Sequence, residues 1–183
     1  MPKLKAIIRY FASHTDPELL GKKKLMKLFY FADFGHVKKY GAPITYDNYV
    51  HLEHGPIPST IMNLISSVEN EKDDSILGDT LKVETRNGSN MKRIVIYKKF
   101  DDQDKKYLNN TELKVLEEVC KKFSSSTGKV IEDASHREAG WLMTKELANI
   151  PYTLAVNDLD CLVEKEDIET LLASFGEKIS KNN

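Results

Sequence analysis

The stretch KKLMKLFYFADFGHVKKY, residues 23–40, carries the densest apolar pattern in the chain. Wound as a helix, it has two apolar faces, one made of Leu25, Leu28, Phe29 and Ala32 and the other of Met26, Tyr30, Phe34 and Val37. A helix that is apolar over so much of its circumference belongs at the centre of a bundle. We therefore predict a core helix over about residues 22–39, ended by Gly41 and Pro43.

Helices are predicted on both sides of this core helix. Apolar residues spaced three and four apart predict helices over 3–13, 58–68, 109–123, 127–137 and 164–177. Asn109 and Glu112 are spaced as a capping box for one of them. Thr45 or Asp47 is a suitable cap for a further short helix, which Gly55-Pro56 would end.

The hydrophobic period changes between residues 80 and 98. LKVET and RIVIY are short β-rich runs on either side of Asn87-Gly88, a dipeptide typical of tight hairpin turns. We therefore predict a small antiparallel hairpin at about 80–98 and an α+β, mainly α fold. Without repeats or linkers, residues 1–183 are expected to form a single domain with a disordered tail at 179–183.

Composition indicates an ordinary soluble protein. The chain is 40% hydrophobic and 30% charged, with a net charge of -1. Cys120 and Cys161 lie in separate segments without a CxxC spacing, which favours reduced thiols. The N-terminus has no signal-peptide core, and no run is long enough to span a bilayer. We expect a cytoplasmic protein with no membrane contact.

The stretch VHLEHGPIPSTI, residues 50–61, is the strongest enzyme candidate. On a helix, His51 and His54 would share a face and could bind zinc, with Glu53 as base and a distant histidine such as His136 completing the site. The spacing matches neither HExxH nor HxxEH. A junction between two helices explains the same residues, and no nucleophile elbow or phosphate loop occurs elsewhere. We predict no enzyme and no cofactor, with a metal-dependent hydrolase as the alternative.

A basic run offers a second alternative. It comprises Lys22, Lys23, Lys24 and Lys27. Because no aromatic or Arg-rich residues are interleaved with these lysines, we favour a solvated helix face over a nucleic-acid-binding patch. Nucleic acid is therefore not an expected partner, although a regulator that binds through these lysines stays open.

The order of four motifs resembles the Panacea domain, also called the SocA-like antitoxin domain. The motifs are KLMKLFYFADFGHVKKYGAPI, YVHLEHGPIPSTI, SHREAGW and NIPYTLAV. The matching positions are Lys24, Leu25, Lys27, Leu28, Tyr30 and Ala32 in the first helix, Tyr40, Gly41 and Pro43 in the turn, Gly55, Pro56 and Pro58 in the junction, and Ser135, His136 and Trp141 in the last piece.

The resemblance implies a bacterial or prophage-encoded antitoxin that neutralises a cognate toxin, encoded by the adjacent gene, through direct protein contact. One type in the family hands its toxin to a protease, which leaves an adaptor role and a protease partner open. The family brings no catalytic residues. As partner-binding residues we predict the aromatic, histidine and proline side chains around the Gly-Pro junction and the later tryptophan: Tyr46, Tyr49, His51, His54, Pro56, Pro58, His136 and Trp141. A lone Trp in a helical protein is more often core, and the oligomeric state stays open.

Overall fold

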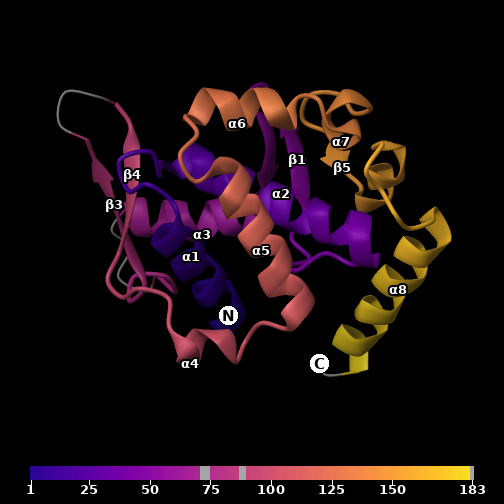
Figure 1. The fold of residues 1–183 in the computed structure, drawn as a ribbon, viewed down its shortest axis with the longest axis horizontal. Helices are drawn as coiled ribbons and strands as arrows, with labels where there is room; N and C mark the ends of the chain where they lie inside the picture. The colour runs from indigo at the N-terminus through magenta and orange to yellow at the C-terminus, as the bar shows by residue number, and fades with distance from the viewer. Residues whose placement is uncertain (71–74, 87–89, 182–183) are drawn as a thin grey trace.

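The computed structural model describes residues 1–70, 75–86 and 90–181. Its centre is helix α2, Lys22–Tyr40, which α5 and α6 cover (Figure 1). Gly41 follows with a φ of 78° and donates its backbone N–H to the Val37 carbonyl, which ends the helix in a left-handed cap. The predicted core helix and its end at Gly41 are confirmed.

The other helices pack around α2. They are α1 Pro2–His14, α3 Ser59–Glu69, α4 Asp102–Lys105, α5 Asn110–Phe123, α6 Gly128–Ser135, α7 Ala139–Leu142, the 3-10 helix η1 Tyr152–Asn157 and α8 Lys165–Lys181. The capping box of Asn109 and Glu112 at the start of α5 is confirmed. Helix α8 continues past the predicted end at 177 into the stretch predicted as tail, and 182–183 lie outside the described residues. Within the described part of the chain, no helix combines the length and apolarity needed to span a membrane.

A three-stranded antiparallel sheet replaces the short helix predicted before Gly55. Its order is β2 Gly55–Pro58, β1 Tyr49–Leu52 and β5 Asn149–Ile150. Burial alternates along β1, with Tyr49 and His51 directed inward, which is the period of a strand. The helix prediction was wrong for this reason, and the Gly-Pro junction is the start of a hairpin strand.

Two buried carboxylates hold the segment that leads into β1. Asp33 of α2 accepts the backbone N–H groups of Ile44 and Thr45, each at 2.8 Å. Asp47 accepts those of Thr60 and Ile61 at 2.9 and 2.8 Å, so it caps the start of α3. The prediction that Asp47 caps a short helix before Gly55 was wrong, because its carboxylate instead accepts from the first turn of α3.

The second sheet is the predicted hairpin, β3 Leu81–Thr85 paired antiparallel with β4 Lys92–Ile96. Its place is confirmed, while the predicted Asn87-Gly88 turn lies outside the described residues. The backbone N–H of Ile94 donates to the Leu20 carbonyl at 3.0 Å, which joins the hairpin to the entry of α2. The protein is therefore α+β and mainly α, as predicted.

The basic run does not form a solvated face. Lys24 and Lys27 are only 1% and 2% exposed, because α2 lies at the centre of the fold. The Lys24 amine donates to the carbonyls of Ser124 and Ser126 at 2.9 and 2.6 Å. Lys22 pairs with Glu69 at 2.7 Å, which leaves Lys23 as the exposed member. The prediction of a solvated basic face was wrong, and the four lysines form no patch for nucleic acid.

Candidate functional site

Three distant parts of the chain meet at the turn between β1 and β2. Gly55 has a φ of 89°, in the region that favours glycine. A Cβ atom placed on Gly55 would lie 2.6 Å from Ser135 Oγ, 2.8 Å from Lys27 Nζ and 3.1 Å from His136 Nε2. The core helix, the hairpin turn and the end of α6 therefore pack here without room for a side chain.

Lys27 connects this turn to the core helix. Its amine donates to the Pro56 carbonyl at 2.8 Å. Burial lowers the pKa of Lys27 from 10.5 to about 7, although the nearby Glu132 carboxylate opposes the shift. The amine therefore changes protonation near neutral pH, whereas an exposed lysine stays charged.

Trp141 lies between two histidines. Its ring stacks on His51 with centroids 4.6 Å apart and on His136 with centroids 4.1 Å apart. The indole N–H donates to the Leu52 carbonyl at 3.4 Å, and His51 Nδ1 lies 2.9 Å from Thr144 Oγ1. Trp141 is half-buried, so one part of the stack packs on β1 while another part meets solvent.

Burial also acts on His136. It lowers the pKa of this imidazole, as does the charge of Lys27, while Glu132 opposes the shift. Its Nε2 atom has no hydrogen-bond partner among the described residues. A neutral ring on Trp141 is therefore the dominant form at physiological pH.

Exposed apolar side chains adjoin this stack. Leu142 and Met143, which follow Trp141, are 62% and 57% exposed, and Leu147 is 75% exposed. Leu147 has a φ of 66°, an uncommon conformation for a bulky residue, and its N–H donates to the His51 carbonyl at 2.8 Å. The fold thus holds an apolar side chain outward at some conformational cost.

The predicted partner-binding residues lie in three separate parts of the structure. His51, His54, Pro56, His136 and Trp141 meet around the hairpin turn, where the His54 side chain is 53% exposed. Tyr49 and Pro58 pair at the other end of the hairpin. Tyr49 is only 1% exposed, and its hydroxyl donates to Asp33 Oδ2 at 2.8 Å. Tyr46 stacks instead on Phe175 of α8.

Sequence reasoning missed Leu142, Met143 and Leu147. They follow Trp141 in a single helical turn and a loop, where no periodic pattern separates exposed from buried positions. The one available signal is their position next to a motif tryptophan. For Lys27, which joins the core helix to the hairpin turn, the sequence carried a stronger signal, because this residue belongs to the motif KLMKL.

The zinc site that was kept as an alternative is not assembled. His51 lies on β1 with its ring against Trp141, whereas Glu53 and His54 lie in the turn, so the three do not share a helix face. Across the described ranges, no group of three or more His, Cys, Asp or Glu side chains could hold a metal ion. Ser135 Oγ donates to the Glu132 carbonyl at 2.8 Å within its own helix.

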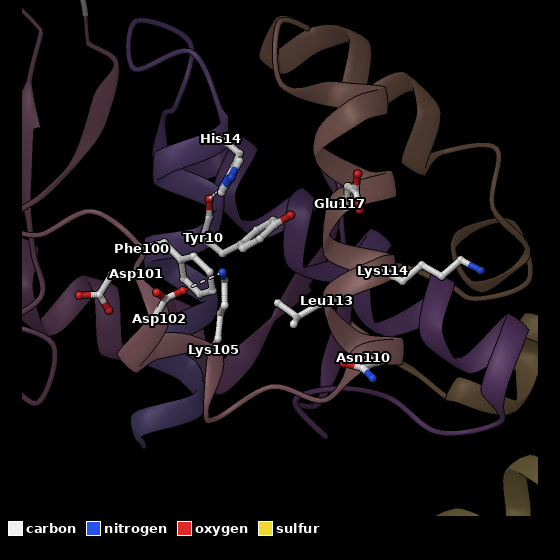
Figure 2. A pocket seen from close by; sticks show the side chains of 10 residues that line it. All are labelled: Tyr10, His14, Phe100, Asp101, Asp102, Lys105, Asn110, Leu113, Lys114 and Glu117. Carbon is white, nitrogen blue, oxygen red and sulfur yellow. Dashed lines mark hydrogen bonds and ion pairs between the residues drawn. The ribbon is translucent and has the colours of Figure 1, made fainter.

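A separate hollow of about 640 Å³ lies between α1, α4 and α5 (Figure 2). It is lined by Tyr10, His14, Phe100, Asp101, Asp102, Lys105, Asn110, Leu113, Lys114 and Glu117. Figure 2 shows Lys105 paired with Asp102, at 2.8 Å, and Lys114 extended away from Tyr10. Burial raises the pKa of Tyr10 to about 12, so its phenol stays neutral. Charges of both signs share the rim, and no predicted partner-binding residue lines the hollow.

The fold and the site define a mainly helical α+β domain in which the hairpin turn packs closely against the core helix and is hydrogen-bonded to it. The family model described as Antitoxin SocA-like, Panacea domain, matches residues 25–142. This match spans more than half of the chain, so the protein belongs to the SocA-like Panacea family, as the motif order predicted. Searches of curated proteins and of solved structures found no match. The family indicates an antitoxin role and suggests a function other than catalysis.

Proposed function

We propose that the protein neutralises a cognate toxin by direct contact, and that the toxin is encoded by the adjacent gene. Membership of the antitoxin family supports the role. The contact region that we propose is called the hairpin-turn surface and consists of His54, His136, Trp141, Leu142, Met143 and Leu147, with the buried His51 ring supporting Trp141 from below.

The exposed, conformationally strained Leu147 beside the His51–Trp141–His136 stack carries this assignment. Neighbouring exposed apolar side chains mark interaction sites on soluble proteins. Tryptophan is enriched among the interface residues that contribute most of the binding energy. Such residues lie in well-packed pockets from which water is excluded. Covering Leu142, Met143 and Leu147 would remove from water the most exposed apolar side chains next to the stack.

Rigidity strengthens the argument. The hairpin turn is held by the Lys27–Pro56 hydrogen bond, by the close packing at Gly55 and by the stacking of the His51 and His136 rings on Trp141. A surface that is already ordered loses less conformational entropy on binding. A preorganised apolar surface of this kind suits stable capture of another protein.

Co-expression with the product of the adjacent gene tests this proposal. We expect that product to stop growth alone, and this protein to restore growth and to copurify with it. Leu142→Asp with Leu147→Asp should abolish both effects, because two buried charges would oppose the contact. Tyr97→Asp is the matched control, since Tyr97 is 59% exposed but follows β4 on the other side of the fold (Figure 1). A harmless neighbour, or equal rescue by the double variant, would contradict the proposal.

A further inference from the structure

Two exposed leucines lie on the loop between η1 and α8, at the end of the molecule that also holds α7 (Figure 1). Leu159 is fully exposed, more than any other large apolar side chain among the described residues, and Leu162 is 76% exposed. Neither side chain belongs to the hydrophobic core. Residues 159–162 are called the leucine loop below.

The leucine loop is held in place by Lys38, near the end of α2. The Lys38 amine forms ion pairs with Glu138, with Asp158 at 3.1 Å and with Asp160 at 2.9 Å. The backbone N–H of Leu162 donates to the Lys38 carbonyl at 2.7 Å. Because Lys38 is 4% exposed, water competes little with these contacts. The two leucines are therefore presented to solvent by an ordered loop.

The same cluster joins the leucine loop to the hairpin-turn surface. Asp158 Oδ1 accepts the backbone N–H of Ala139, the first residue of α7, at 2.7 Å. Leu142 ends this single helical turn and belongs to the hairpin-turn surface. Helix α7 also packs on η1, from which the leucine loop follows. The leucine loop therefore extends the exposed apolar area beyond Leu142.

The surroundings of the leucine loop are acidic. Residues 158–169 contain six Asp and Glu residues against one Lys, an excess of five negative charges. Lys38 and Glu138 add one group of each sign and leave this excess unchanged. Asp158 Oδ2 pairs with the Lys38 amine but makes no hydrogen bond among the described residues, and the Asp160 side chain is 75% exposed. One amine therefore does not neutralise the carboxylates around the two leucines.

These charges favour a basic protein segment as the occupant of the loop. Nucleic acid and anionic lipid headgroups carry negative charge, so the acidic surroundings repel them. A two-fold contact with a second copy of this chain would place the same carboxylates face to face. A segment that combines lysine or arginine with apolar side chains is attracted by the carboxylates and covers the leucines.

We propose that the leucine loop binds a basic, amphipathic segment of the toxin. Leu159 and Leu162 contact the apolar side chains of this segment, and Asp160 pairs with one of its lysines or arginines. The inference rests on the proposed function, because the toxin is the partner, and it adds the chemistry of the toxin surface.

Isothermal titration of the purified protein with the product of the adjacent gene tests this inference at two salt concentrations. Leu159→Ser with Leu162→Ser should weaken binding by at least about tenfold, because apolar contacts are lost. Asp160→Asn with Glu166→Gln should weaken it about fivefold at about 50 mM salt and much less at about 500 mM, since salt screens exposed charges. Asp102→Asn is the matched control and should bind as the wild type does, because its side chain is 91% exposed but lies on α4, away from the loop (Figure 1).

The outcomes separate this inference from the proposed function. A wild type that does not bind the product overturns the proposed function and the inference with it. Wild-type binding that both double variants retain in full, with unchanged unfolding midpoints, overturns the inference alone. Wild-type affinity that does not fall with salt does the same, because exposed carboxylates must attract a basic segment. Leu159→Ser alone, at the fully exposed position, decides the apolar part if the double variant unfolds more easily.

Discussion

The Lys27 amine donates a hydrogen bond to the carbonyl oxygen of Pro56 at 2.8 Å, across 29 positions of sequence. This bond joins the second turn of the core helix to the hairpin turn. Its donor is 2% exposed, so water does not compete with it. The position of the proposed hairpin-turn surface therefore follows from the packing of α2.

Replacing Lys27 by Met should change how stability depends on pH. Lys27 titrates near 10.5 when unfolded and about 7 when folded, so between these values the unfolded chain binds more protons. The stability that Lys27 contributes therefore rises with pH, by at most about 1.4 kcal/mol per unit. The difference in unfolding free energy between wild type and Lys27→Met, measured in urea, should rise across this range. A difference that stays constant with pH would show that Lys27 keeps an ordinary pKa.

Gly55→Ala should destabilise the protein by about 2 kcal/mol or more, because it combines a positive φ with a crowded Cβ. Gly128→Ala is the matched control. Its Cβ would meet nothing within 4 Å, and it starts α6, so the change should be neutral or stabilising by up to about 1 kcal/mol. Urea unfolding of both variants makes the comparison, and equal midpoints would contradict the packing described at the turn.

Tyr49→Phe should cost about 1.5–3 kcal/mol, because the buried Asp33 carboxylate loses a hydrogen bond from the tyrosine hydroxyl. Tyr97→Phe should leave stability unchanged, since Tyr97 is 59% exposed. Thermal and urea unfolding measure both effects. Similar behaviour of the two variants would mean that Asp33 does not depend on Tyr49.

Leu147→Gly separates binding from stability. Glycine adopts the φ of 66° without strain, and the exposed leucine gives up little burial, so unfolding should change by less than about 1 kcal/mol. Neutralisation of the toxin should nevertheless weaken, because an apolar contact is lost. Growth rescue and unfolding, measured on the same variant, check the two halves. Full rescue by a folded Leu147→Gly protein would remove Leu147 from the contact.

The sequence pattern predicted α2 well, because a helix with apolar residues around most of its circumference must be buried. The pattern failed for β1 and β2. Each strand has only four residues, and the prolines and histidines in and between them hide the alternation that is typical of a strand. The pairing of Tyr49 with Ile150 stabilises this sheet across a hundred positions, which no local pattern reports.

The candidate site was predictable in part. The motif order singled out Gly55, His136 and Trp141, and the structure brings these residues together. The buried state of Lys27 was not predictable, because lysine is almost always exposed unless specific partners replace water. For Lys27 that partner is the backbone carbonyl of Pro56, and a backbone carbonyl carries no sequence signature.

The affinity of the purified protein for the product of the adjacent gene tests the central claim most directly. Isothermal titration of the wild type, the Leu142→Asp Leu147→Asp double variant and Tyr97→Asp would compare the hairpin-turn surface with a control surface. We predict that the double variant loses at least about a hundredfold in affinity while keeping its unfolding midpoint, and that Tyr97→Asp binds as the wild type does. Undiminished affinity of a folded double variant would contradict the account.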